Sequence, residues 1–200
     1  MTVEKRAIRQ QLREQRRGLS ADIVEAAGRA VQPRLQAFPP YQVARAVIGY
    51  IADENEVPTA ALLAGSVRDA LIVYLPLTAG GVARWRPGQD LAVGRGGVRE
   101  PACSVPEQPE IPALALVPVV AWDRYGTRVG RGGGFYDRLF ATLRSGITRV
   151  GLAYEFQEFS RLPRDVWDVS MHFVITERRI VPCGDVPVEA SVQKGGLQLS

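Results

Sequence analysis

The sequence has little of what several kinds of binding and catalytic site require. It holds two cysteines, Cys103 and Cys183, which lie far apart and belong to no CxxC pair or Cys/His cluster. We therefore expect reduced thiols rather than a disulfide framework or a structural zinc site. The single histidine, His172, lies in an apolar stretch that favours a packed residue over a catalyst. Chemistry that needs several histidines is excluded.

Long hydrophobic runs are also missing. No apolar segment approaches the ~18 residues that a membrane-spanning helix needs, and the amino terminus is charged rather than a signal sequence. We therefore expect a cytoplasmic protein with no membrane partner. We also expect a monomer. The chain of 200 residues is 46% hydrophobic, enough for one substantial core, so residues 1–182 are expected to form one domain. Residues 183–200 have few large apolar side chains, which predicts a flexible tail.

Hydrophobic periodicity predicts an alternation of helices and strands. Apolar residues at helical spacing indicate two initial helices, over residues 2–17 and from Ser20 to the prolines at 39 and 40. Short apolar runs rich in β-branched residues then alternate with helical segments. We expect strands at 43–50, 71–75, 114–120, 147–153 and 171–176, helices at 59–70 and 135–144, and a β-ribbon with loops within 82–109. This order predicts an α/β fold, a single-domain three-layer α/β/α sandwich with a mostly parallel sheet and a small β-ribbon insertion.

Positive charge is concentrated at the amino terminus although the net charge is only +4. The first helix carries six basic side chains: Lys5, Arg6, Arg9, Arg13, Arg16 and Arg17. Such a cluster suits a polyanion. Nucleic acid and a small ligand with phosphates or carboxylates both satisfy this requirement, and a solvated helix face is the simpler alternative.

The most informative stretch is the glycine-rich segment at 122–138, which reads WDRYGTRVGRGGGFYDR between a predicted strand and a predicted helix. Closely spaced glycines after a parallel strand let backbone N–H groups approach phosphate oxygens, and the next helix adds its positive end. The segment is not a Walker A loop, because no Gly-Lys-Ser/Thr closes it. It is not a dinucleotide fingerprint either, because Phe135 occupies the place of the third glycine. Arg131 is a candidate bidentate phosphate partner, and Asp137 could hold Mg²⁺. A flexible turn with solvated arginines is the alternative.

The order of residues in this segment resembles the signature of the 5-formyltetrahydrofolate cyclo-ligase family. The resemblance extends from Lys5 to about Glu177. It also includes Glu56 within Asn-Glu-Val-Pro-Thr, the segment Gly-Val-Arg-Glu-Pro at 97–101, Gly-Leu-Ala-Tyr at 151–154, and Asp168 after Leu-Pro.

The resemblance implies ATP-dependent closure of a folate ring, with ATP and Mg²⁺ as cofactors and small-molecule partners only. It implies catalytic roles for Lys5, Glu56 and Arg131. ATP would be bound by Lys5, Arg9, Arg128, Gly130, Arg131, Gly132, Gly133, Gly134, Phe135 and Tyr136. The folate would be bound by Tyr50, Glu56, Trp85 and Tyr136. Asp137 and Asp168 would hold the metal ion.

Four positions depart from the family pattern: Pro58, Leu77, Trp167 and His172. They leave the glycine loop and both candidate metal carboxylates intact, so they bear on substrate affinity more than on reaction class. Two other functions stay open at this point. A noncatalytic protein could use the same loop to bind a nucleotide or folate, and the basic helix could bind RNA. The RNA alternative is disfavoured, because it leaves the glycine loop unexplained and no RNA-binding signature is present.

Overall fold

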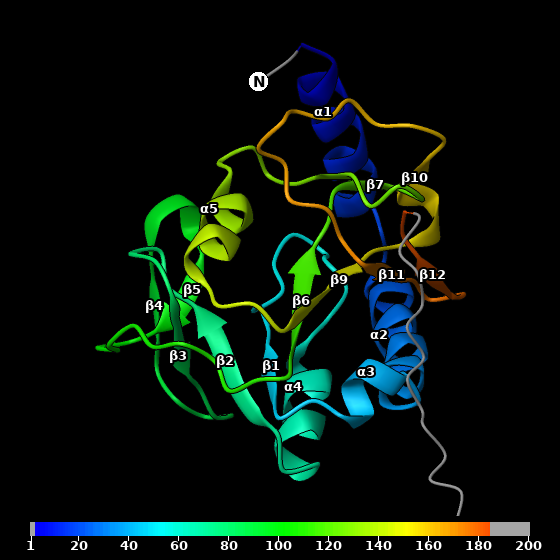
Figure 1. Cartoon of the computed structure of the whole chain (residues 1–200). Helices are drawn as coiled ribbons and strands as arrows, with labels where there is room; N and C mark the ends of the chain where they lie inside the picture. The colour runs from blue at the N-terminus through cyan, green and yellow to red at the C-terminus, as the bar shows by residue number, and fades with distance from the viewer. Residues whose placement is uncertain (1–2, 185–200) are drawn as a thin grey trace, which may run out of the picture.

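A seven-stranded sheet runs through the middle of the molecule (Figure 1). The computed structural model describes residues 3–184. Five central strands are parallel, and one antiparallel strand closes each edge. In spatial order the strands are β12 (Ile180–Pro182), β11 (Phe173–Ile175), β9 (Ile147–Leu152), β6 (Ala113–Pro118), β1 (Ala46–Ile48), β2 (Ile72–Pro76) and β3 (Val82–Arg84). The predicted α/β class and mostly parallel sheet are confirmed.

Three helices cover one face of the sheet: α2 (Ala21–Gln36), α3 (Pro39–Gln42) and α4 (Ala60–Arg68). Ser20 caps α2, because its side chain accepts a hydrogen bond from the Ile23 N–H at 3.4 Å, as predicted. Val31 and Leu63 are fully buried against Val47 and its neighbours in the parallel strands. The short helix α3 was not predicted. Consecutive prolines typically end a helix, whereas here they occupy the first positions of a new helical turn.

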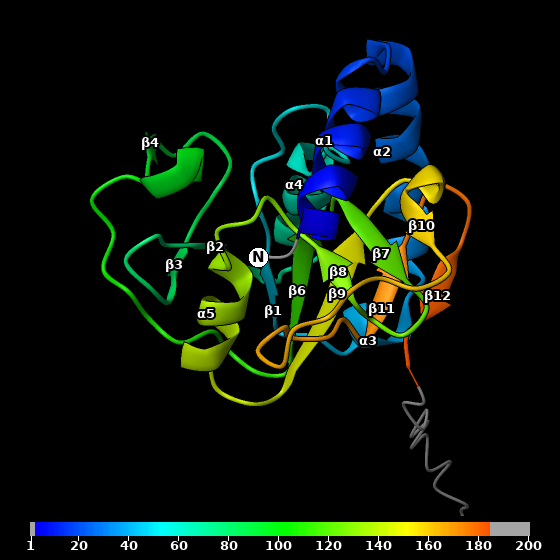
Figure 2. The same cartoon turned by 90° about the horizontal axis from the view of Figure 1, so that it is seen from above.

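The opposite face is covered by α5 (Phe135–Thr142) and by a small second sheet of β10 (Glu158–Phe159), β7 (Ala121–Asp123) and β8 (Arg128–Val129). The first helix, α1 (Val3–Arg17), packs on this second sheet rather than on the main one (Figure 2). Ile8 and Leu12 provide its apolar contacts, with Val129 among the residues beneath them. This packing fixes the basic helix over the carboxyl ends of the parallel strands.

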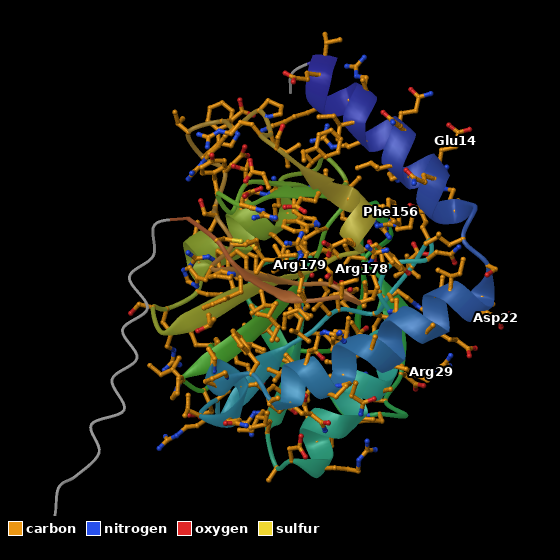
Figure 3. The ribbon with its side chains drawn as sticks, turned by 90° about the vertical axis from the view of Figure 1, so that its right-hand side faces the viewer. Glu14, Asp22, Arg29, Phe156, Arg178 and Arg179 are labelled. Atoms are coloured by element: carbon orange, nitrogen blue, oxygen red, sulfur yellow. The ribbon has the colours of Figure 1, made fainter. Side chains whose placement is uncertain are left out.

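The outer surfaces of α1 and α2 are polar. Glu14 on α1, and Asp22 and Arg29 on α2, point away from the body of the protein (Figure 3). Arg29 forms an exposed ion pair with Glu25 one turn earlier in α2. The helix α1 therefore has the solvated polar face expected of an amphipathic helix, but only some of its basic side chains lie on that face.

The middle region contains a two-stranded antiparallel ribbon of β4 (Leu91–Val93) and β5 (Arg99–Pro101), joined through the 3-10 turn η1 (Arg95–Gly97). The ribbon was predicted, but one of its expected parts was misplaced. Residues 82–84 pair with β2 as the edge strand β3 of the main sheet, because their backbone groups complete the open edge of that strand.

Several smaller predictions concern single residues. Trp122 is fully buried, and its indole N–H donates to the Tyr154 carbonyl at 3.3 Å, which confirms a structural role.

Neither cysteine forms a disulfide, and Cys183 is buried among core residues although the predicted tail begins there. Residues 185–200 of that tail and residue 2 lie outside the described residues. Within residues 3–184, no helix has the length and apolar character needed to cross a membrane.

Candidate active site

A cavity of about 920 Å³ opens at the carboxyl ends of β1, β2 and β6. The segment after β1 contributes Tyr50, Asp53 and Glu56 to its lining, the turn after β2 contributes Thr78, and the turn after β6 contributes Val120. The carboxyl edge of a parallel sheet is where α/β proteins bind their ligands. The predicted position of Glu56 at this edge is therefore confirmed.

The glycine loop, residues 130–134, forms another wall of the cavity. The segment 122–138 follows the parallel strand β6 as predicted, but the β7–β8 hairpin lies between that strand and the glycines. A tight turn causes the reversal. The Asp123 carboxylate accepts hydrogen bonds from the N–H groups of Tyr125 and Thr127, and Gly126 takes a positive φ of 82°. The chain then returns to the cavity.

The loop leads directly into α5, whose amino terminus faces the same space. Gly134 precedes the helix with φ 61° and ψ 23°, a left-handed conformation that glycine adopts without a Cβ penalty. As the N-cap residue of α5, Gly134 has no side chain that could accept a hydrogen bond from the first turn of the helix. Its N–H groups are therefore available to an anion in the cavity, where the helix dipole also favours negative charge.

Two basic side chains of α1 enter the cavity from the opposite side. Lys5 is buried, and its Nζ lies 2.8 Å from Asp165 Oδ2 and 2.5 Å from Asp168 Oδ2. Burial opposes the charged amine, but the hydrogen bonds to both carboxylates outweigh it and raise the pKa of Lys5. Arg9 donates from Nε to the Gly130 carbonyl at 2.7 Å, and its buried Nη1 has no hydrogen-bond partner among the described residues. That nitrogen is a donor suited to a ligand oxygen.

Arg131, inside the glycine loop, forms ion pairs across the cavity. Its Nη2 lies 3.1 Å from Glu56 Oε1 and 3.3 Å from Asp53 Oδ2. Glu56 is 5% exposed, and burial raises its pKa while Arg131 and Arg16 act in the opposite direction. Arg131 and Glu56, two of the three predicted catalytic residues, thus lie in contact although they are 75 positions apart.

The two candidate metal carboxylates both line the cavity and are both held by basic neighbours. Asp137 Oδ1 accepts from Arg128 Nη2 at 2.8 Å and from the Val169 N–H at 3.0 Å. Asp168 Oδ2 accepts from Lys5 and from the Asp165 N–H. The second oxygen of each carboxylate has no hydrogen bond among the described residues.

This donor set fits an ion that needs few protein ligands. Across residues 3–184 there is no group of three or more His, Cys, Asp or Glu side chains that could enclose a metal ion. Mg²⁺ usually takes one or two carboxylates and completes its octahedron with phosphate oxygens and water. Asp137 and Asp168 are compatible with Mg²⁺ bound together with a polyphosphate, and no dedicated metal cage is present in this part of the chain.

Three aromatic residues predicted to contact ligands also line the cavity: Tyr50, Phe135 and Tyr136. The Tyr50 hydroxyl donates to the Val57 carbonyl at 2.9 Å. Burial raises the pKa of Tyr50 and of Tyr136 well above the ordinary value, so both phenols stay neutral. Phe135 contacts Tyr136 edge to face, with ring centroids 5.2 Å apart. These rings give the cavity the apolar walls that a flat heterocycle needs.

Trp85 does not join this group, so its predicted contact with the folate stays a prediction that the cavity lining does not explain. It is 8% exposed, lies in the core with the helices α2 and α4, and is not among the residues that line the cavity. The physical reason is the alternation of side chains along the edge strand. Val82 faces the α5 side of the sheet, whereas Trp85 faces the other side.

The sequence interpretation missed several residues that belong to the site or support it. Asp53, Asp165, Arg95 and Arg99 line the cavity, and Arg16 lies behind Glu56. A signal for Arg16 existed, since the buried positions of α1 are 5, 8, 12 and 16, at helical spacing. Position 16 therefore belongs to the inward face despite its charge. His172, by contrast, is absent from the cavity lining, and burial lowers its pKa to about 4.

The fold and the cavity together define an α/β protein with a cavity at the carboxyl edge of its sheet, lined by basic side chains and by the glycine loop. A sequence model of the 5-formyltetrahydrofolate cyclo-ligase family matches residues 1–177. The 5-formyltetrahydrofolate cyclo-ligase of Escherichia coli (strain K12) is 30% identical over 178 residues, which cover 84% of this chain and 98% of that protein. The chain belongs to the 5-formyltetrahydrofolate cyclo-ligase family, a family of enzymes, and the predicted membership is confirmed.

Solved structures agree with this assignment. The NMR structure of the Aquifex aeolicus 5,10-methenyltetrahydrofolate synthetase matches with a TM-score of 0.76 and 28% identity, over 96% of this chain and 99% of that one. The 5,10-methenyltetrahydrofolate synthetase from Mycoplasma pneumoniae matches with a TM-score of 0.66 and 19% identity, over 88% and 99% respectively. The second likeness supports the fold alone.

Proposed function

We propose that this protein uses ATP to cyclise 5-formyltetrahydrofolate to 5,10-methenyltetrahydrofolate, with release of ADP and phosphate. Family membership supports the reaction class. The observation that carries the proposal for this chain is the cavity itself, where the glycine loop, Lys5 and Arg9 lie opposite Glu56 and Tyr50. One part of the cavity suits a polyphosphate, and the other suits a neutral heterocycle with hydrogen-bond donors. The proposed partners are these two small molecules only.

The chemistry requires that a formamide oxygen become a leaving group. In the proposed reaction the formyl oxygen attacks the γ-phosphorus of ATP and ADP departs. N10 of the folate then attacks the activated carbon and gives up its proton to solvent, and the C–O bond breaks to release phosphate and leave the methenyl bridge. No covalent enzyme intermediate is needed, so the protein acts through positioning and charge neutralisation.

The phosphate side of the site is assigned to the basic residues. Lys5, Arg9 and Arg131, together with the N–H groups of residues 130–134, would neutralise the charge that develops on the transferred phosphoryl group. Arg128 holds Asp137 in place through their 2.8 Å ion pair. Asp137 and Asp168 would hold Mg²⁺, which would supply positive charge next to the phosphate groups of the nucleotide.

The folate side is assigned to Glu56, Tyr50 and Tyr136. A buried carboxylate accepts hydrogen bonds from adjacent N–H donors such as those of a pterin ring, so Glu56 would fix the ring and thereby the formyl group. Tyr50 and Tyr136 would contribute apolar contact and neutral hydroxyls. Trp85 has no role in this proposal, because it does not line the cavity.

The direct test mixes purified protein, Mg-ATP and 5-formyltetrahydrofolate and follows the methenyl chromophore in the near ultraviolet. We expect the signal to grow only when ATP is present and to disappear in Arg131→Ala and Asp137→Ala. Arg29→Ala, on the exposed face of α2, is the matched control and should retain full activity. Binding of both ligands without any chromophore would contradict the proposal and favour a noncatalytic binding protein.

A further inference from the structure

The side chain of Arg16 is 1% exposed although it carries a full charge. It extends from the last turn of α1 toward the back of Glu56 and does not line the cavity. Its Nε donates to the Glu54 carbonyl at 2.9 Å, and Nη1 donates to the Val119 carbonyl at 3.4 Å. Nη2 lies 3.7 Å from Glu56 Oε1 and 3.8 Å from Glu54 Oε2, and it makes no hydrogen bond among the described residues.

Glu56 therefore lies between two guanidinium groups with different surroundings. Arg131 contacts Glu56 from the cavity side, with 32% of its side chain exposed, and it also pairs with Asp53. Arg16 contacts Glu56 from the protein interior and is held by two backbone carbonyls. Arg131 can turn toward a ligand, whereas Arg16 cannot leave without breaking the packing of α1.

Arg131 and Arg16 would change their contacts differently when ligands bind. Arg131 is the loop residue that we assign to the transferred phosphoryl group, and the N–H donors that turn toward phosphate oxygens are no longer available to Glu56. Glu56 would then be a buried carboxylate without its cavity-side cation. Isolated buried carboxylates are costly and take up a proton, which removes one hydrogen-bond acceptor.

We infer that Arg16 is a positioning residue that keeps Glu56 ionised and oriented toward the folate while Arg131 binds the nucleotide phosphate. The inference rests on the proposed function and extends it to a residue outside the cavity lining. On nucleotide binding, Glu56 Oε1 exchanges Arg131 for Arg16, whose Nη2 is already within 3.7 Å and needs only a small shift to donate a hydrogen bond.

Other titratable groups around Glu56 do not replace this cation. Tyr50, Tyr136 and Tyr154 interact with Glu56 as neutral phenols, and Asp53, on the same segment, is itself an acid. Arg16 from α1 and Arg131 from the glycine loop are the positive charges that oppose the effect of burial on the pKa of Glu56. With Arg131 engaged by phosphate, the pKa of Glu56 depends on Arg16.

The test compares 5-formyltetrahydrofolate binding with and without a nonhydrolysable ATP analogue in wild type, Arg16→Lys and Arg16→Met. In Arg16→Met we expect the analogue to weaken folate binding about tenfold, because both cations are then absent. A rise in pH should reverse the loss by restoring the ionised carboxylate. Arg16→Lys should recover part of the affinity. Arg17→Met is the matched control, since Arg17 pairs with Glu54 and not with Glu56.

Two further measurements separate this role from simple destabilisation. Urea unfolding shows whether Arg16→Met is folded, and Arg16→Lys serves in its place if it is not. In a Glu56→Gln background, Arg16→Met should no longer couple nucleotide binding to folate binding. The inference would be overturned by a loss of folate affinity that is equal with and without the analogue, or by coupling that persists in the Glu56→Gln background. Turnover by the wild type decides the proposed function independently.

Discussion

Lys5 Nζ lies 2.5 Å from Asp168 Oδ2, although 163 positions separate the two residues in the chain. This ion pair joins the first turns of α1 to the segment that follows the second sheet. Each partner is buried or half-buried, and both line the cavity. The contact therefore both closes one side of the site and places a cation next to a candidate metal ligand.

Removal of the Lys5 charge should impair turnover more than folding. We expect Lys5→Met to lower kcat/KM for ATP about 100-fold, because one donor to the transferred phosphoryl group is lost. Asp165 and Asp168 would also lose their shared cation. The measurement is steady-state kinetics at varied Mg-ATP, with Arg6→Met, an exposed position of the same helix, as control. Equal kinetics for Lys5→Met and wild type would remove Lys5 from the catalytic assignment.

The glycine loop offers a test of close backbone approach to the ligand. A Cβ built at Gly133 meets nothing within 4 Å, and the residue has no positive φ, so Gly133→Ala should fold normally. The new methyl group would nevertheless occupy space at the cavity wall. We expect the KM for ATP to rise about tenfold with unchanged thermal stability.

Gly65→Ala is the matched control for that experiment. Gly65 lies in α4, where an added Cβ makes only ordinary contacts from 3.7 Å outward, and it is remote from the cavity lining. Its substitution should leave the KM for ATP unchanged. An unchanged KM in Gly133→Ala as well would show that the loop backbone does not approach the nucleotide.

The sequence predicted the fold well where local patterns carry the information. The parallel strands are continuous apolar runs, and helices such as α2 have clear caps, so their presence followed from periodicity. The β7–β8 hairpin was missed because its strands span only a few residues, almost all of them inside the glycine-rich segment at 122–138 that was interpreted as a loop. The edge strand β12 was also missed because it is only 3 residues long.

The site was predictable to the extent that motifs and the family resemblance name residues. The glycine loop, Lys5, Glu56 and the two aspartates all reach the cavity as expected. The contacts among them were not predictable, because they join segments that are distant in sequence. Which side of the sheet Trp85 faces depends on the register of β3 with β2, and pairing register is a property of the folded sheet.

Acid should weaken the link between α1 and the segment after β1. Hydrogen bonding to Arg13 lowers the pKa of Glu54 from 4.5 to about 2, and Arg17 adds to this effect. A carboxyl whose pKa is depressed by folding contributes stability above its unfolded value and loses it as pH falls. We therefore expect the free energy of unfolding to decrease from about pH 4.5 to about pH 2, as urea titrations would show.

Glu54→Gln distinguishes this link from general acid effects. The variant should be less stable than wild type near neutral pH, and its stability should fall less steeply across the same acid range. Glu25→Gln is the control, because its partner Arg29 is highly exposed and such pairs contribute little. Parallel acid profiles for wild type and Glu54→Gln would contradict the assigned role of Glu54.

Trp85 tests whether a residue named by resemblance acts in the core or in folate binding. Its buried Nε1 has no hydrogen-bond partner among the described residues, so Trp85→Phe removes no hydrogen bond and only part of the packing. We expect Trp85→Phe to cost about 1 kcal/mol of stability and to leave the KM for 5-formyltetrahydrofolate unchanged. Trp85→Ala should cost about 3–5 kcal/mol, since a large cavity forms beneath β3. If Trp85→Phe instead raised the folate KM severalfold at wild-type stability, the edge strand would have to move on folate binding to bring the indole to the ligand.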